Sequence, residues 1–89
     1  MEILIVYKPE KKMAAECIFY KIAQKLNFRY IRPDKREMIL LDGTYIKMIE
    51  AKEPNLRGRR CDLIFMDNNI TIEEVYNFCY GRYKEVRFF

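Results

Sequence analysis

Two short runs of apolar residues constrain the fold of this chain more than any other feature. They occupy residues 3–7 and, directly after Asp62, residues 63–66. An unbroken apolar run of this length is typical of a strand that is buried on both faces, as in a parallel sheet. We therefore expect strands over 3–7 and 62–66 at the centre of a sheet that helices cover.

Two amphipathic helices are expected beside these strands. Between residues 13 and 26 the apolar positions repeat at the spacing of one helix face, and Pro9 suits the first turn before it. Those positions are Ala15, Ile18, Phe19, Ile22 and Leu26. A second helix is expected from Thr71, because Thr71 and Glu74 form a capping box, to a stop near Gly81.

A β-hairpin is expected over residues 37–50. Asp42-Gly43 separates apolar runs at 38–41 and 44–49, and this dipeptide favours a type I′ turn, in which both central residues have positive φ. Further short strands are expected at 28–31 and 85–88, with 3–7, 62–66 and 85–88 parallel. The sequence thus predicts one α/β domain over 1–89, a small three-layer sandwich with a mainly parallel sheet, a β-hairpin and two helices.

Composition excludes several kinds of catalytic and metal site. The 89 residues include no histidine, which rules out a Ser-His-Asp triad and a zinc site that needs imidazole. The three cysteines form no C-x-x-C pair, so we expect reduced thiols and no bound metal. No stretch approaches the roughly 20 apolar residues of a membrane span, and the sequence predicts a soluble intracellular protein.

Residues 42–67 carry a resemblance to a known family. Asp42-Gly43-Thr44 lies in the hairpin, Leu56-Arg57-Gly58 in the next loop, and Asp67 at the end of the next strand. This order resembles the Walker-B half of the ATPase core of phage terminase large subunits and related helicases. In that family the aspartate holds Mg²⁺ and a glutamate after it activates water. The resemblance makes Asp67 a residual Walker-B-like residue.

The chain departs from that family where nucleotide chemistry is done. Asn68 follows Asp67 in place of the glutamate, and no G-x-x-x-x-G-K-[ST] loop is present to hold phosphates. We therefore expect a truncated ATPase-core-like domain that is not an enzyme and needs no cofactor. The resemblance implies a phage or prophage interaction protein in the cytoplasm of a bacterial host. It would bind or inhibit a nucleic-acid-handling machine; one form is an anti-CRISPR-like inhibitor of a host-defence nuclease.

Arginine clusters are the candidate partner-binding residues. Arg57, Arg59 and Arg60 lie within four residues, and Arg32 and Arg36 flank the Pro33 turn. The arginine side chain grips carboxylates and phosphates with two hydrogen bonds, so a protein partner and, alternatively, DNA or RNA are both consistent with these clusters. The expected parallel strands bring Lys8 and residues 67–69 to the opposite edge of the sheet.

A second motif predicts a different chemistry. Asp34 follows Pro33, and Glu50 and Lys52 follow the hairpin, which matches the P-D…E-x-K signature of restriction-endonuclease-like nucleases. In that family the two carboxylates hold Mg²⁺ and the lysine stabilises charge at the phosphate. A small Mg²⁺-dependent nuclease that uses these three residues is therefore the other alternative. The sequence leaves the oligomeric state open.

Overall fold

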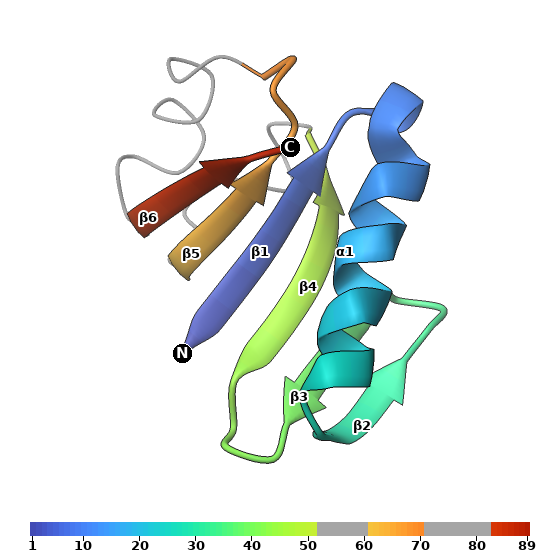
Figure 1. The fold of residues 1–89 in the computed structure, drawn as a ribbon, viewed down its shortest axis with the longest axis vertical. Coiled ribbons are helices and arrows are strands. Elements are labelled where there is room, and N and C mark those ends of the chain that lie inside the picture. Colours follow the sequence, from blue (N-terminus) through green and yellow to red (C-terminus); the bar gives the residue numbers. More distant parts are fainter. Residues whose placement is uncertain (52–60, 71–82) are drawn as a thin grey trace.

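A computed structural model describes residues 1–51, 61–70 and 83–89, which form one mixed sheet with a helix on it (Figure 1). The chain begins in a central strand and continues through a helix to two strands at one end of the sheet. It then adds a strand beside the first one and finally builds the opposite end of the sheet. The elements are β1 (Glu2–Tyr7), a 3-10 turn (Pro9–Lys11), α1 (Lys12–Lys25), β2 (Phe28–Arg32), β3 (Glu37–Leu40), β4 (Tyr45–Glu50), β5 (Cys61–Met66) and β6 (Tyr83–Phe88).

The strand order of the sheet is β2-β3-β4-β1-β5-β6. Strand β1 pairs in parallel with β4 and β5, and β5 pairs in parallel with β6. Strand β3 pairs antiparallel with both β2 and β4. The sheet is therefore mixed, and the expected mainly parallel sheet is not confirmed. The second helix of the prediction falls on residues 71–82, outside the described residues, so the three-layer sandwich is not confirmed either.

Strand β1 is buried on both faces, as its unbroken apolar run predicts. Ile3 and Ile5 pack in one cluster with Phe19 of α1, whereas Leu4 and Val6 alternate onto the opposite face. The second cluster also contains residues of β4 and β5, namely Ile49, Cys61, Ile64 and Met66, together with Ile70. The two clusters place β1, with β4 and β5 beside it, at the centre of the core.

Helix α1 covers the sheet face on which Ile3 and Ile5 lie. Its buried residues Ala15 and Phe19 are four apart and so point to the same side of the helix. The last turn ends where the Leu26 amide donates to the Ile22 carbonyl at 2.9 Å, after which the backbone becomes extended. Throughout residues 1–51, 61–70 and 83–89, no helix has the length and apolar composition needed to cross a membrane.

The hairpin forms where the sequence predicts it, but the predicted turn type is wrong. The Gly43 amide donates to the Leu40 carbonyl at 3.0 Å, and the Leu40 amide donates to the Thr44 carbonyl at 2.9 Å. Within residues 41–43, which lie between the bonded pair Leu40 and Thr44, Gly43 alone has a positive φ, at 88°. This is a three-residue loop with the glycine in the left-handed region, not a two-residue type I′ turn. Asp42 favours it because its Oδ1 accepts the Thr44 amide at 2.9 Å.

Candidate functional site

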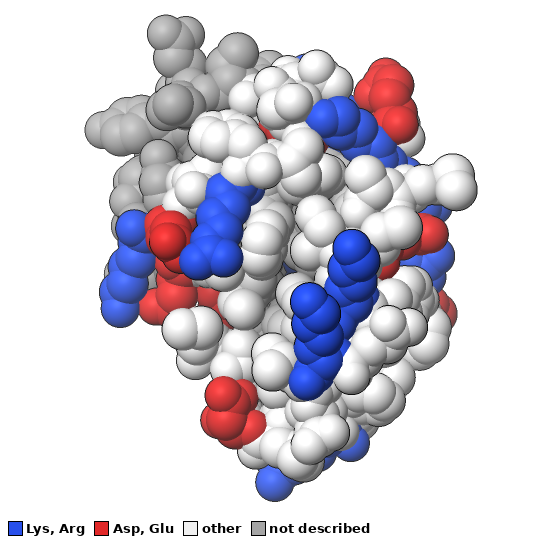
Figure 2. Space-filling view, viewed as in Figure 1, with Lys and Arg blue, Asp and Glu red and all other residues white. Residues whose placement is uncertain are grey.

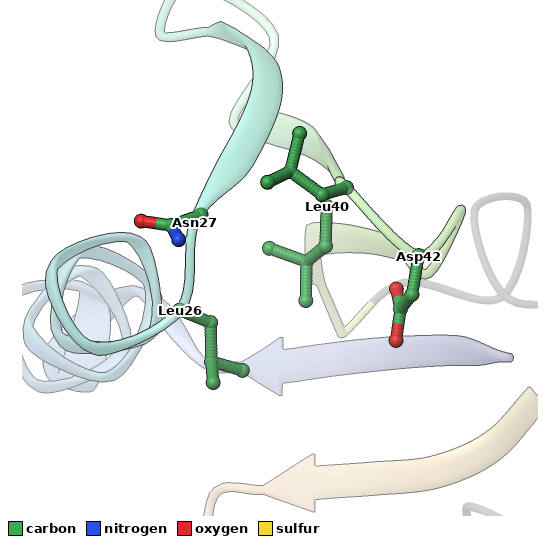
Figure 3. A pocket seen from close by; sticks show the side chains of 5 residues that line it. Leu26, Asn27, Leu40 and Asp42 are labelled. Carbon is green, nitrogen blue, oxygen red and sulfur yellow. The ribbon is translucent and has the colours of Figure 1, made fainter.

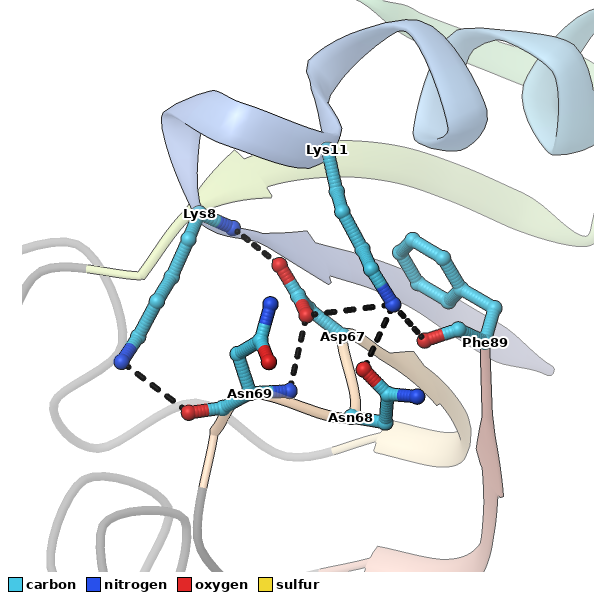
Figure 4. Close-up of polar contacts among 6 residues, drawn as sticks. All are labelled: Lys8, Lys11, Asp67, Asn68, Asn69 and Phe89. Atoms are coloured by element: carbon cyan, nitrogen blue, oxygen red, sulfur yellow. Dashed lines mark hydrogen bonds and ion pairs between the residues drawn. The ribbon is translucent and has the colours of Figure 1, made fainter.

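The strand ends around Asp67 form the polar cluster that the sequence predicts at one edge of the sheet. We call it the Asp67 corner; it consists of Lys8, Lys11, Asp67, Asn68, Asn69 and Phe89 (Figure 4). Main-chain bonds bring the segments together, since the Asp67 amide donates to the Val6 carbonyl at 3.0 Å and the Asn68 amide donates to the Phe89 carbonyl at 2.8 Å. The corner therefore joins the carboxyl ends of β1, β5 and β6.

Asp67 is 0% exposed, and both of its carboxylate oxygens are used within the protein. Oδ2 accepts the Lys8 amide at 3.0 Å, and Oδ1 accepts the Asn69 amide at 2.8 Å. The Lys11 ammonium lies 3.7 Å from Oδ1 and supplies the opposite charge. A buried carboxylate with two main-chain donors and a cation is well compensated, and it ties the end of β1 to the end of β5.

Lys11 links Asp67 to Phe89, the residue that follows β6. Its ammonium donates to the Asn68 side-chain oxygen and, at 2.8 Å, to the Phe89 carbonyl. The same ammonium lies 5.9 Å from the centre of the Phe89 ring, a cation–π distance. Lys8 makes a separate bridge to the Asn69 carbonyl at 3.0 Å. Both lysines at this edge therefore contact other residues of the corner.

The structure places Arg36 in an internal contact. Its Nη2 lies 3.1 Å from Oε1 of Glu16 on α1, and its other donors reach the same oxygen and the Pro33 carbonyl. The hydrogen bond to Glu16 raises the pKa of the Arg36 guanidinium. Arg36 also has a positive φ of 51° at the end of the β2–β3 turn. This arginine ties the turn between β2 and β3 to α1, and its side chain remains 32% exposed.

Arg32, by contrast, stays half exposed. Its guanidinium lies 3.7 Å from Glu37 and 5.5 Å from the centre of the Tyr30 ring. Tyr30 and Arg32 are two apart on β2 and share a sheet face. Arg32 is therefore oriented but accessible. The other three predicted binding residues, Arg57, Arg59 and Arg60, lie outside the described residues.

Glu37 is the centre of a polar cluster that sequence reasoning missed. It accepts the Tyr45 hydroxyl at 2.6 Å, and the Lys47 ammonium lies 3.6 Å away. The bond from Tyr45 lowers the pKa of Glu37, and the charges of Lys47 and Arg32 add to the effect. Glu37 and Lys47 face each other across β3 and β4. Glu37 and Lys47 lie five residues before and five residues after Asp42, so a three-residue loop centred on Asp42 was the register that could have revealed this pair.

The residues of the nuclease motif are only partly placed. Asp34 is exposed in the turn between β2 and β3, and Glu50 is the last residue of β4. The turn and the carboxyl end of β4 lie at the same end of the strands. Lys52 lies outside the described residues. Glu50 faces Tyr7 in the register of β4 and β1. Burial raises the pKa of the Tyr7 hydroxyl, and the Glu50 charge raises it further. Across the described ranges, no three Asp, Glu or Cys side chains lie close enough together to hold a metal ion.

An apolar surface at the start of β2 was also missed by the sequence analysis. Leu26, Asn27, Leu40, Leu41 and Asp42 line an open pocket of about 240 Å³, and Figure 3 shows their side chains around it. Leu26 and Leu41 are 50% and 62% exposed. Alternating apolar residues predict a strand, but they do not say whether that strand lies at the centre or at the end of a sheet.

Surface charge is mixed on the face that Figure 2 shows. Lys and Arg side chains form separate groups there, and Asp and Glu side chains lie beside several of them. Among the described residues, the ion pairs Lys84–Asp62 and Arg87–Glu85 have distances of 3.3 and 3.4 Å. On the described part of this face, the Lys and Arg side chains do not form a continuous stripe of the kind that tracks a phosphate backbone.

Comparison with known proteins identifies no family for this chain. No protein-family model, no curated protein and no solved structure matches it.

Proposed function

We propose that this chain is a non-catalytic interaction protein that binds or inhibits a machine that handles nucleic acids. The observation that carries the non-catalytic part is the state of Asp67, the residue that corresponds to the Walker-B aspartate in the resemblance. Its carboxylate is fully buried, and both oxygens accept main-chain amides. It performs a structural task in the position where an ATPase would hold Mg²⁺.

The contacts of Asp67 oppose metal binding for a physical reason. Mg²⁺ requires nearly octahedral oxygen ligands and keeps several of its waters. To ligate the ion, Asp67 would have to be exposed, and the Lys8 and Asn69 amides would lose their acceptor. The Lys11 ammonium, 3.7 Å from Oδ1, would also repel a divalent cation. Asn68 strengthens the argument, because an amide side chain cannot act as a general base.

The kind of partner follows from the resemblance. A domain that resembles a terminase or helicase core, and that lacks the phosphate loop, fits a phage or prophage protein that acts in the host cytoplasm by contact rather than by catalysis. Inhibition of a host-defence nuclease, in the manner of an anti-CRISPR protein, is the concrete form we propose. Arg57, Arg59 and Arg60 are its main proposed contact residues, and Arg32 and Arg36 are proposed to support them.

Affinity purification from bacterial cells tests this function. A tagged wild-type chain is expected to retain a protein of nucleic-acid processing or defence after nuclease treatment. The triple variant Arg57→Ala, Arg59→Ala, Arg60→Ala is expected to keep its circular dichroism spectrum and to bind that protein at least about tenfold more weakly. Retention of the partner only in the presence of DNA or RNA would contradict the proposal.

Two activity measurements address the alternatives. Direct nucleic-acid binding predicts an affinity for bare DNA that falls steeply between about 50 and 200 mM salt, because counterions are released on binding. The nuclease alternative predicts Mg²⁺-dependent cleavage that is lost in Glu50→Ala. We expect neither result. Either one, obtained with the purified chain, would replace the interaction function with an activity on nucleic acid itself.

A further inference from the structure

Strand β2 is an end strand of the sheet with large apolar side chains on its surface. In the described sheet it pairs with β3 on one side and stands last in the strand order (Figure 1). Phe28 is 43% exposed and Tyr30 is 39% exposed. An end strand leaves alternate N–H and C=O groups unpaired along its outer side, and these groups can pair with another extended chain.

The exposed apolar surface of β2 continues into the pocket beside it. The Leu41 amide donates to the Asn27 carbonyl at 3.2 Å, so the loop that carries Leu41 lies against the residue that precedes β2. Leu26, Phe28 and Leu41 are therefore neighbours at the start of the strand. We call this surface, formed by β2 with Leu26 and Leu41, the β2 edge.

A register shift places the two aromatic residues of β2 on different faces. Phe28 faces Leu40 and Tyr30 faces Ile39, so residues two apart on β2 meet consecutive residues on β3. Leu40 packs in the cluster beneath α1, and consecutive strand residues point to opposite faces. Phe28 thus lies on the α1 face with the pocket, and Tyr30 lies on the other face with Arg32. An added strand would meet apolar surface on both faces.

The charge of strand β2 itself is positive, because Arg29 and Arg32 lie in the strand. In the flanking turn Lys35 and Asp34 offset each other, and the one acidic residue of the pocket lining is Asp42. In the part of the chain that the structure describes, Arg29 has no ion pair, and it is exposed. The Glu37 carboxylate nearby is already engaged by Tyr45 and Lys47. The side chains that would complement this edge therefore combine acidic with apolar groups.

We propose that the β2 edge is the docking site for an extended, acidic segment of the protein partner, which adds to the sheet as a strand beside β2. This inference rests on the proposed function, since it names the surface through which the interaction protein binds. Main-chain pairing gives such contacts their affinity, and the side-chain pockets give them specificity. A second copy of this chain fits less well, because pairing two β2 strands would bring two copies of Arg29 and two copies of Arg32 into one short interface.

Selection from a library of random twelve-residue peptides on the immobilised wild-type chain tests the proposal without a known partner. We expect the selected peptides to alternate apolar with acidic residues. Their binding should shift the NMR resonances of residues 28–32 and of Leu41. Methylation of alternate peptide nitrogens should abolish binding, because a paired strand needs those N–H groups. An unmodified selected peptide serves as the probe in all measurements below.

A charge reversal with a matched control locates the contact. Arg29→Glu should weaken binding of the selected peptide at least about tenfold, because it places a like charge opposite the acidic side chains. Lys21→Glu changes the net charge equally, but it lies on the exposed side of α1. The control should bind within about twofold of wild type, and Arg29→Gln should fall between the two.

Three results of the peptide experiments would overturn the proposal. They are a library that yields no binders, binders that shift resonances away from β2, and binding that Arg29→Glu leaves unchanged. Sedimentation of the free chain as a dimer whose interface contains residues 28–32 would overturn it in favour of a second copy. None of these results depends on nucleotide or nucleic acid. Failure of the β2 edge is therefore distinguishable from failure of the interaction function.

Discussion

The Asp67 corner and the β2 edge differ in burial and pairing: polar groups are buried and paired at the corner, whereas apolar and charged groups are exposed at the β2 edge. At the corner, a fully buried carboxylate, two amides and a lysine satisfy one another across three strand ends. At the β2 edge, Phe28, Tyr30 and Leu41 remain exposed, and Arg29 carries a charge without an ion pair in the described residues. The corner resembles a catalytic site in sequence but works as a structural joint. The surface suited to a partner lies at the far end of the sheet.

The comparison predicts that changes at the corner cost the most stability. Asp67→Ala leaves the Lys8 and Asn69 amides without their acceptor and the Lys11 charge without its partner. We expect the free energy of unfolding to fall by about 2–4 kcal/mol, mainly because two main-chain amides lose their acceptor. Urea denaturation followed by circular dichroism measures it. Asp67→Asn keeps one acceptor oxygen and should cost less than Asp67→Ala; a loss below about 0.5 kcal/mol for Asp67→Ala would remove the structural role.

The Gly43 loop, which adjoins the β2 edge, should show an intermediate effect on stability. Gly43 has a φ of 88°, which L-residues rarely adopt, although a Cβ at this position would meet no atom within 4 Å. Gly43→Val should therefore lower the free energy of unfolding by about 1–3 kcal/mol through backbone strain alone. Gly43→Asn is the matched control, because asparagine tolerates this conformation better. Equal melting temperatures for the valine variant and wild type would show that the loop geometry is wrong.

The Glu37 cluster should contribute a smaller, pH-dependent effect. The Tyr45 bond holds the pKa of Glu37 below its ordinary value of 4.5 in the folded chain. A carboxylate with a lowered pKa stabilises the fold above the unfolded-state pKa, and this contribution is lost as the pH falls through the folded-state value. Glu37→Gln should flatten the fall in unfolding free energy between about pH 5 and pH 3. Parallel pH curves for variant and wild type would contradict the assigned contact.

The β2 edge should show the smallest effect on stability. Arg29 and Phe28 are exposed, so Arg29→Gln and Phe28→Ser should change the free energy of unfolding by less than about 0.5 kcal/mol each. Chemical denaturation of the two variants beside Asp67→Ala gives the comparison directly. A loss above about 1 kcal/mol for Phe28→Ser would mean that this side chain belongs to the core and is not available to a partner.

Local patterns predicted much of the fold, and contacts distant in sequence account for the rest. The apolar run at 3–7 and the helical spacing after it are local signals, and both elements formed. Asp42-Gly43 located the hairpin but not its turn, because the same dipeptide also suits a three-residue loop with glycine in the left-handed region. The position of β4 beside β1 could not be predicted, since local periodicity does not encode which strands become neighbours.

The candidate site was harder to predict than the fold for a related reason. Asp67 was identified by its place at a strand end, and the edge it shares with Lys8 followed from parallel strands. Its ion pair comes from Lys11, which is distant in sequence. Arg36 was expected to face a partner, but Glu16, on a helix 20 residues earlier, pairs with it. Charge clusters in a sequence do not reveal which of their members are already paired inside the fold.

An NMR titration of the wild-type chain with Mg²⁺-ATP tests the central claim most directly. The Lys8 and Asn69 amides donate to the two oxygens of Asp67, so their resonances report any change at that carboxylate. The account predicts that both resonances stay in place up to millimolar Mg²⁺-ATP, because the carboxylate is already fully used. Saturable shifts of the Lys8 and Asn69 amides would show that Asp67 binds the metal, and they would contradict the structural role of the corner.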